Sequence, residues 1–380
     1  MKVSLLTALL LLTSPLAFPA DSDERSKESA TASPFPLQLE ARVPFAPTAF
    51  PSGDHSHVVY ELYLTNFSER PIQLQRIDVL DARKPDSRKL ASFEAESLDA
   101  VLQPVGSQAP ENKADIREIR AGATVVAFIW IPINAHESTP EHLRHRVVTT
   151  SGTIEGVDLE THHDRLPSLL PPVRGKGWLA SDGPSNVPNN HHRRGILAIN
   201  GHVTTSRRYA IDWILQKDNA SLSGNPQDLR SYYSYDQPVF AVADAEVVTA
   251  RDGIPNNTPG SPETFRHAVP ITMDTVGGNT VVLNLGSGQY AWYFHLAPGS
   301  IQVKAGERVR RGQLLARVGC SGDPTVPHLH FEVTSSPKLL GGEGLPYLID
   351  HYRIWNDKKW ESRTEELPLA GTVVEFGNDE

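Results

Sequence analysis

The chain has 380 residues and contains only one cysteine, Cys320. A single thiol excludes an intramolecular disulfide. No long run of Lys or Arg offsets the formal net charge of −9, which excludes the basic surface that nucleic-acid binding requires. After the first 20 residues, no segment approaches the roughly 18 consecutive apolar residues that indicate a transmembrane helix. We therefore expect no membrane span in the remainder of the chain.

Long amphipathic helical patterns are also scarce. The 30 prolines and 27 glycines divide the chain into short segments, and this favours β-strands joined by turns. A hydrophobic fraction of 39% and a charged fraction of 21% are typical of a folded chain rather than a disordered one. Since single domains usually contain roughly 100–200 residues, the length predicts two domains.

The first 20 residues, MKVSLLTALLLLTSPLAFPA, have the pattern of a signal peptide. Lys2 supplies a positive start, and the apolar run that follows is too short to span a bilayer. Small residues make cleavage near Ala20 plausible, and the polar residues 21–34 are predicted to form a flexible leader. No cysteine that could carry a lipid anchor lies near this cut. Export is therefore predicted, and the lack of an evident wall-anchor motif favours the periplasm over the extracellular space.

Residues 35–165 are predicted to form an accessory domain, an immunoglobulin-like β-sandwich. Val58–Leu64 and Val147–Thr150 are rich in β-formers, and Ala123–Ile131 is an almost continuous apolar run of strand length. Short strands separated by polar turns are typical of two packed sheets. His162–Asp164 could bind a metal, but its polar neighbours fit a solvated loop better. We find no other residues in this domain that indicate chemistry.

Five prolines and three glycines fall within residues 166–190, so this segment is predicted to be a linker. The second domain is predicted over residues 191–352, as an antiparallel β-sheet, with residues 353–380 as a C-terminal tail. Because the linker separates the two domains, a fragment that starts near Gly183 is expected to fold and act alone.

The clearest chemical signal lies in the segment PHLHFEV, which contains His328 and His330. Residues i and i+2 of a strand point to the same face, so the two imidazoles are about 7 Å apart by strand rise. Leu329 and Phe331 then face a core on the opposite side. An isolated HxH is often incidental, but here it follows a loop rich in Gly, Ser and Pro. The pair suits two metal ligands, or one ligand and one acid/base group.

Two further segments place polar residues among apolar ones. His295 ends an aromatic strand just before a turn, where a histidine either faces a cleft or has a structural role. Tyr293, two residues earlier, is expected to share its face and line the same groove. Asp212 lies in the apolar segment AIDW, and a buried carboxylate needs a partner or a metal. That partner could be a nearby arginine, Arg207 or Arg208.

Together these segments match the motifs of one family, in the same order along the chain. Residues 190–335 resemble the lysostaphin/LytM-type zinc metallopeptidases, peptidase family M-23, with the duplicated-hybrid-motif fold. The resemblance implies a mainly β protein that binds a single Zn²⁺ and hydrolyses peptide bonds of bacterial peptidoglycan. It also implies that Asp212 and His330 are zinc ligands, while His295 and His328 are catalytic. The matching segments are RRYAIDW, QPVFAVADAEVV, GGNTVVLNLG, YAWYFHLAPGSI, VKAGERVRRGQLLARVGCSG and PHLHFEV.

The sequence departs from the family at one ligand. Most members have a histidine four residues before the aspartate, where this chain has Arg208. A guanidinium stays protonated and cannot bind zinc. The resemblance then implies that a more distant upstream histidine completes the set, and the candidates are His191, His192 and His202.

Turn geometry ranks these candidates. Asn200-Gly201 predicts a tight hairpin, which would bring His191 or His192 beside the strand that contains Asp212. His202 lies ten residues before Asp212, about 33 Å away along an extended strand. Strict pairing favours His191, and one bulge favours His192. The sequence HHR resembles relatives in which the His next to Arg is the ligand. His192 is therefore predicted as the upstream zinc ligand, with His191 and His202 as alternatives.

Two other functions stay open. A relative without zinc could bind and activate a cell-wall amidase, although Asp212, His295, His328 and His330 are all retained here. An adhesive surface protein could instead use the first domain to bind glycan. Metal content and hydrolysis assays separate the first of these from the endopeptidase, and binding by the isolated sandwich tests the second.

Overall fold

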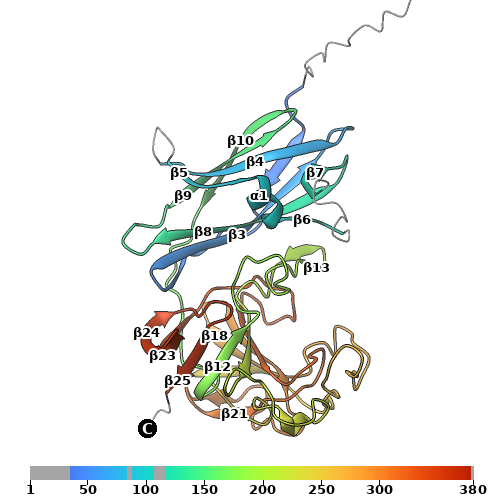
Figure 1. Cartoon of the computed structure of the whole chain (residues 1–380), viewed down its shortest axis with the longest axis vertical. Coiled ribbons are helices and arrows are strands. Elements are labelled where there is room, and N and C mark those ends of the chain that lie inside the picture. Colours follow the sequence, from blue (N-terminus) through green and yellow to red (C-terminus); the bar gives the residue numbers. More distant parts are fainter. Residues whose placement is uncertain (1–34, 84–87, 107–115, 378–380) are drawn as a thin grey trace, which may run out of the picture. The chain divides into compact units, whose positions relative to one another are not determined.

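The structure is a computed structural model that describes residues 35–83, 88–106 and 116–377. The predicted signal peptide, residues 1–20, and the leader, residues 21–34, lie outside the described residues. Strands dominate the described residues, as predicted, and a single α-helix, α1 (Ala95–Val101), is found among them (Figure 1). The described residues from Leu37 onward form one compact unit.

The N-terminal half contains two antiparallel sheets packed face to face around one apolar core. We call this part the N-terminal sandwich. Its immunoglobulin-like strand order stays a prediction. Among the described residues, one sheet has the order β1-β3-β8-β6 with β2 beside β3, and the other has β10-β9-β4-β5 with β7 beside β4. Their strands are β1 (Leu39–Arg42), β2 (Phe50–Ser52), β3 (His55–Asn66), β4 (Ile72–Asp81), β5 (Lys89–Glu94), β6 (Leu102–Pro104), β7 (Glu118–Ile119), β8 (Thr124–Asn134), β9 (His142–Thr149) and β10 (Gly152–Glu160).

The burial of strand β3 explains why its sequence alternates only partially between apolar and polar residues. Tyr60 and Leu62 belong to the core of the sandwich, whereas Val59 belongs to the core of the C-terminal half. Successive residues of a strand point to opposite faces, so both faces of β3 are buried. The same rule directs Glu61 toward the C-terminal half.

The C-terminal half is built on an eleven-stranded sheet among the described residues, with the order β11-β23-β25-β12-β15-β22-β19-β18-β17-β20 and β24 beside β23. Two short pairs, β13-β14 and β16-β21, lie outside it. The elements are β11 (Ser168–Leu169), β12 (Gly175–Ser181), β13 (Leu197–Ile199), β14 (His202–Thr204), β15 (Ile211–Leu215), the 3-10 turn η2 (Leu229–Ser231), β16 (Pro238–Phe240), β17 (Ala245–Arg251), β18 (Asn279–Gly286), β19 (Gln289–Leu296), β20 (Arg308–Val309), β21 (Leu314–Arg317), β22 (Leu329–Thr334), β23 (Leu348–Asn356), β24 (Lys359–Glu366) and β25 (Val373–Phe376).

This sheet differs from the predicted boundaries. The segment 166–190, predicted as a linker, contains β11 and β12, and residues 353–380, predicted as a tail, contain β24 and β25. Strand β12, in green, pairs with β25, in red (Figure 1), and on its other side with β15. Trp178 of β12 is fully buried in the core. A fragment that starts at Gly183 would lack this central strand, so we no longer expect it to fold unaided.

Strand register brings four positions into one line across the sheet. Asp212 on β15 is paired with Ser181 on β12 and with His330 on β22. His330 is in turn paired with Phe294 on β19. Leu329 and Phe331 on the other face of β22 are fully buried in the core, which confirms the predicted division of faces.

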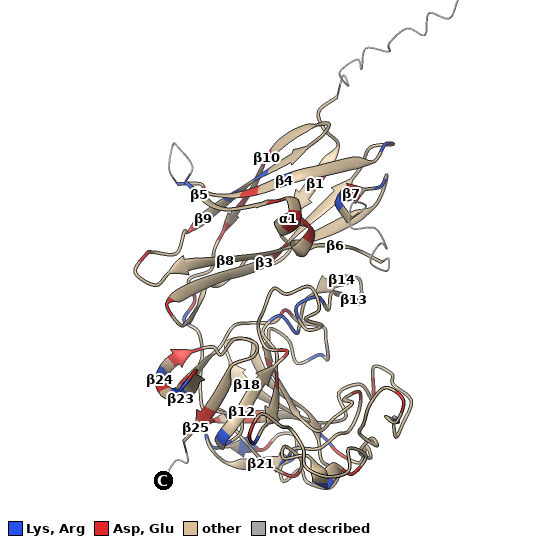
Figure 2. Cartoon of the chain, viewed as in Figure 1, with Lys and Arg blue, Asp and Glu red and all other residues tan. Residues whose placement is uncertain are grey.

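Figure 2 shows positive and negative residues interspersed along the strands and loops that the structure describes. This distribution agrees with the absence of a basic run in the sequence. Within the described ranges, no helix has the length and apolar character needed to cross a bilayer.

Candidate metal centre

Asp212 and His330 meet because their strands are adjacent. Paired residues of neighbouring antiparallel strands lie within about 4.5–5.5 Å. His330 Nδ1 lies 2.9 Å from Asp212 Oδ1 in hydrogen-bond contact. Both side chains are buried. Asp212 makes no ion pair with the arginines considered as its partners, since Arg208 pairs with Glu61 and Glu343 instead.

The upstream histidine approaches from a turn rather than a strand. The hairpin predicted at Asn200-Gly201 forms between β13 and β14, and both turn residues have positive φ, 50° and 82°. His192, however, lies in a turn before β13, outside the paired strands of this hairpin. Its predicted strand pairing is therefore wrong. The His192 ring donates from Nδ1 to the Asp182 carbonyl at 2.7 Å, which leaves the lone pair on Nε2. Nε2 lies 3.5 Å from Asp212 Oδ2.

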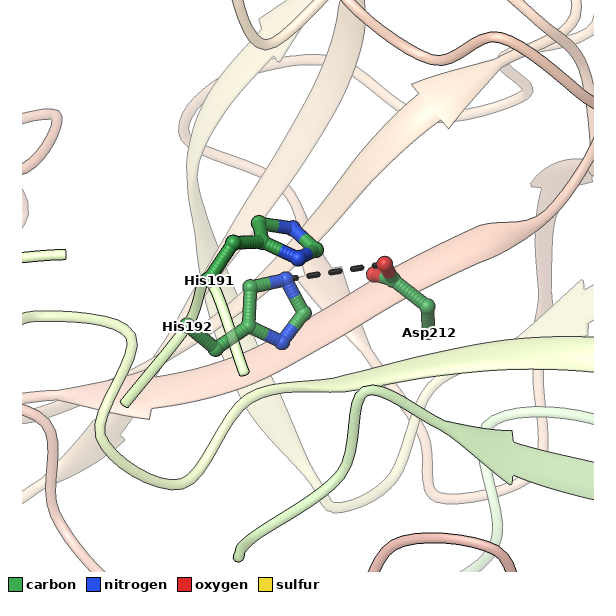
Figure 3. A group of neighbouring side chains, drawn as sticks. All are labelled: His191, His192 and Asp212. Atoms are coloured by element: carbon green, nitrogen blue, oxygen red, sulfur yellow. Dashed lines mark ion pairs between the residues drawn. The ribbon is translucent and has the colours of Figure 1, made fainter. Parts of the chain in front are cut away.

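The alternatives to His192 are less well placed. His191, His192 and Asp212 offer ligand atoms within 4.8 Å of one another, and Figure 3 shows both rings beside the carboxylate. The His191 side chain is 54% exposed and its Nδ1 lies 3.7 Å from Asp182 Oδ1, whereas the His192 side chain is 2% exposed. His202 is exposed on β14. The geometry therefore supports His192 as the third ligand.

Two further histidines complete the group. His328 donates from Nδ1 to the Val326 carbonyl at 2.9 Å, and its Nε2 lies 3.4 Å from Asp212 Oδ1. His295 donates from Nδ1 to the Ser321 carbonyl at 3.0 Å, and its ring centroid lies 5.0 Å from that of His328. The structure thus brings all five predicted site residues together. We call them the histidine cluster: His192, Asp212, His295, His328 and His330.

The expectation for Tyr293 is wrong. Its side chain is fully buried, and its hydroxyl accepts a hydrogen bond from the Val242 amide at 3.0 Å. His295 has a left-handed backbone with a φ of 62°, and this breaks the alternation of β19. Phe294 and His295 consequently both line the pocket, while Tyr293 faces the core. A non-glycine residue in this conformation is uncommon, and such residues concentrate at functional sites.

The buried groups shift one another's protonation. Burial lowers the pKa of His192 to about 3 and, with His328 and His330 nearby, that of His295 well below its usual value. Burial alone would raise the pKa of Asp212, but His328 and His192 outweigh it and lower that pKa. For His330, burial would lower the pKa, but the hydrogen-bonded Asp212 carboxylate and the nearby Glu332 carboxylate outweigh it and raise that pKa to about 9. The carboxylates around His330 therefore favour a positive charge on its ring.

Glu332 is a site residue that the sequence analysis missed. It follows His330 by two positions and shares its face, so the pattern HxHxE could have identified it. Its side chain is buried, and its Oε2 has no hydrogen-bond partner among the described residues, although His330 Nε2 lies 3.4 Å away. A metal-bound histidine usually donates its second ring N–H to a carboxylate, and Glu332 is placed to accept it.

The donor set fits zinc. His192 presents a free Nε2, Asp212 presents carboxylate oxygens, and His330 can bind through Nδ1 while Nε2 faces Glu332. Two imidazoles and one carboxylate are typical of catalytic zinc, with a fourth position left for water or substrate.

The cluster lies in a pocket of about 730 Å³. Arg207 also lines this pocket, although the sequence indicated it only as a possible partner of Asp212. Its Nε has no hydrogen-bond partner among the described residues. A pocket of this size, with converging polar groups and shifted pKa values, is the expected form of a binding site. Its apolar lining includes Leu197, Ile199, Ile271, Met273, Leu339 and Leu340.

Comparisons with known proteins find similarity to one peptidase family. Residues 229–340 match Peptidase family M23. Glycyl-glycine endopeptidase ALE-1 of Staphylococcus capitis is 42% identical over 57 residues, 15% of this chain and 15% of that protein. Peptidoglycan DD-endopeptidase ShyB of Vibrio cholerae is 46% identical over 56 residues, 15% of this chain and 13% of that protein. The catalytic domain of lysostaphin from Staphylococcus simulans aligns with 42% of this chain and 76% of its own at 22% identity, with a TM-score of 0.21.

The C-terminal half therefore contains a domain of peptidase family M23, the family that the motifs predicted. The matched range includes His295, His328 and His330, and it begins after His192 and Asp212. The matches span 15% and 13% of the two curated relatives' lengths. The match supports a hydrolase that acts on peptides.

Proposed function

We propose that this chain is a zinc-dependent endopeptidase that hydrolyses peptide bonds of bacterial peptidoglycan, in the stem peptide or the cross-link. The histidine cluster carries the proposal, because Asp212, buried in a pocket of the C-terminal half, faces His192, His328 and His330 within 3.5 Å. The names of two relatives, a glycyl-glycine endopeptidase and a peptidoglycan DD-endopeptidase, support the substrate class.

His192, Asp212 and His330 would hold the metal, with Glu332 orienting His330. When bound, zinc supplies Lewis acidity to the scissile carbonyl and lowers the pKa of water to about 7. Asp182 fixes His192 through its carbonyl, so that Nε2 stays directed at Asp212.

His328 and His295 would move the proton. Each donates from Nδ1 to a backbone carbonyl, so each neutral ring presents Nε2 as an acceptor. One imidazole of the pair takes the proton of the attacking water as general base. The resulting imidazolium gives that proton to the leaving amine nitrogen as the C–N bond breaks. Burial keeps His295 neutral near pH 7, as an acceptor must be.

The pocket suits a peptide that carries carboxylates. Arg207 lines the pocket, and no ion pair of its guanidinium is found among the described residues. A carboxylate of the substrate would form that pair. Because peptidoglycan lies outside the cytoplasm, this function fits the predicted export, with the periplasm as the proposed location.

The test is zinc analysis of the purified chain combined with product analysis of digested peptidoglycan. We expect stoichiometric zinc and new muropeptides that differ by cleavage of a peptide bond, with activity lost to a chelator and restored by Zn²⁺. Binding to the cell wall without zinc and without cleavage would contradict the proposal. That result would support the alternative of a regulator that binds and activates an amidase.

A further inference from the structure

We propose that the N-terminal sandwich builds part of the metal centre, with Glu61 on β3 as a positioning residue for His192. The inference rests on the proposed zinc function of the histidine cluster. It gives the sandwich a role that the endopeptidase proposal leaves undefined. Residues 190–195, here called the 190–195 turn, are the link between the two.

The 190–195 turn docks on the sandwich through the residue next to His192. Arg193 is fully buried and forms an ion pair with Glu61. Its Nη2 donates to the Tyr60 carbonyl at 2.9 Å and to the Ile129 carbonyl at 3.2 Å. Strands β3 and β8 therefore hold the backbone on one side of the proposed ligand.

Arg194 adds a second set of contacts to the same turn. Its Nη2 donates to the Ala100 carbonyl of α1 at 2.8 Å, and its Nη1 donates to the Val101 carbonyl at 3.2 Å. Phe128 on β8 receives both guanidinium groups, with ring-centroid distances of 4.7 Å for Arg193 and 4.2 Å for Arg194. These contacts of Arg193 and Arg194 join the turn to β3, β8 and α1 of the sandwich.

Glu61 also holds the other side of the site. Arg208, which occupies the usual ligand position four residues before Asp212, donates from Nε and Nη2 to Glu61 at 3.0 and 2.5 Å. Arg208 pairs with Glu343 at 2.7 Å as well. Burial would raise the pKa of Glu61, but Arg208 and Arg193 outweigh it and lower that pKa, so Glu61 is ionised.

One carboxylate of the sandwich thus fixes the segments on which two proposed ligands lie. Arg193 is adjacent to His192, and Arg208 leads into β15 and Asp212. The position where many relatives have a ligand is used here to join the two halves, and the ligand comes from the joined turn. Removing Glu61 would leave two buried guanidinium groups without their shared partner, which would displace the turn.

The experiment compares Glu61→Gln with a matched control, Asp78→Asn, in the full chain. Asp78 is a buried carboxylate on β4 whose partners Arg76, Lys89 and Ser92 all belong to the sandwich. Zinc affinity is measured by chelator competition, and hydrogen exchange is measured without metal. We expect Glu61→Gln to weaken zinc binding by about tenfold or more and to speed exchange in the 190–195 turn. Asp78→Asn should leave both unchanged.

A folded Glu61→Gln chain with the zinc affinity and turn protection of the parent would overturn the proposal. If that variant does not fold, Arg194→Gln decides, because it removes hydrogen bonds without leaving a buried charge. Reduced zinc affinity and faster turn exchange in Arg194→Gln support the proposal, and unchanged values overturn it. Failure of the parent chain to bind zinc would instead refute the endopeptidase, and hydrogen exchange would still test the role of Glu61.

Discussion

Both halves of the molecule bury polar side chains, but they satisfy them differently. In the sandwich, Asp78 receives Arg76, Lys89 and Ser92, and the Tyr60 hydroxyl donates to His145 Nε2 at 2.7 Å. In the C-terminal sheet, the histidine cluster gathers around one carboxylate beside a pocket, and Glu332 Oε2 has no hydrogen-bond partner among the described residues.

This difference distinguishes polar groups that are buried to stabilise the fold from polar groups that are buried to serve a function. A buried polar group that is fully paired stabilises its own fold. A group that is incompletely paired and faces a pocket is suited to an external partner. We therefore expect substitutions in the sandwich to change mainly stability, and substitutions in the histidine cluster to change metal binding and turnover.

The largest effect is expected from His330 on β22 and from His328, which directly precedes that strand. His330→Ala should lose stoichiometric zinc and with it all measurable hydrolysis, because a proposed ligand is removed. His328→Ala should keep zinc and lose roughly 10²–10⁴-fold in turnover, as expected for an acid/base group. Metal analysis and muropeptide release measure the two effects. Equal zinc content in both variants and the parent would show that the ligand assignment is wrong.

The next effect concerns the upstream ligand. His192→Ala should weaken zinc binding by more than the tenfold to hundredfold typical of a supporting residue. His191→Ala and His202→Ala are the controls and should bind zinc almost as the parent does, because one side chain faces Asp182 and the other is exposed. A loss of zinc affinity confined to His191→Ala would show that His191, and not His192, is the ligand.

A smaller effect is expected at Glu332. Glu332→Gln keeps the shape but removes the negative charge that would accept a hydrogen bond from His330 Nε2, so zinc affinity should fall about tenfold to hundredfold. Glu246→Gln, an exposed change on β17 of the same sheet, is the control. If the two variants bind zinc equally well, Glu332 has no part in the metal site.

The smallest effect is a pH dependence that belongs to the sandwich. Burial lowers the pKa of His145 below 6.5, so the unfolded chain takes up a proton there before the folded chain does. Stability is therefore lost as the pH falls through 6.5, by at most about 1.4 kcal/mol per pH unit. His145→Gln should reduce this slope in urea unfolding at pH 7.5 and 5.5 with chelator present. An unchanged slope would mean that His145 titrates alike in both states.

Sequence pattern predicted the centre of the site because strand periodicity governs it. His330 and Asp212 lie in regular strands and His328 directly precedes β22, so alternation largely fixes which side chains share a face. The same rule failed at Tyr293, because the left-handed backbone of His295 reverses the alternation. Long-range contacts decide which upstream histidine faces Asp212, because Arg193, next to His192, docks on Glu61 and Tyr60 far away in the sequence. Local sequence pattern does not contain these contacts.

Domain boundaries were harder to predict for a related reason. Prolines and glycines around β12 gave the composition of a linker, yet Trp178 and Ala180 are buried between β15 and β25. Both partner strands come from later in the chain, one of them close to its C-terminal end. Local composition does not contain such long-range pairing, so it predicted an independent second domain where the described residues from Leu37 onward form one unit.

The left-handed backbone of His295 implies a conflict between robustness and activity. A residue with a β-carbon in this conformation destabilises the fold by about 1–2 kcal/mol, and glycine relieves most of that strain. Selection for heat resistance alone would therefore favour replacement of His295, and the same change would remove a proposed catalytic imidazole. A laboratory evolution experiment that rewards only survival of the fold should yield stable but inactive chains altered at this position.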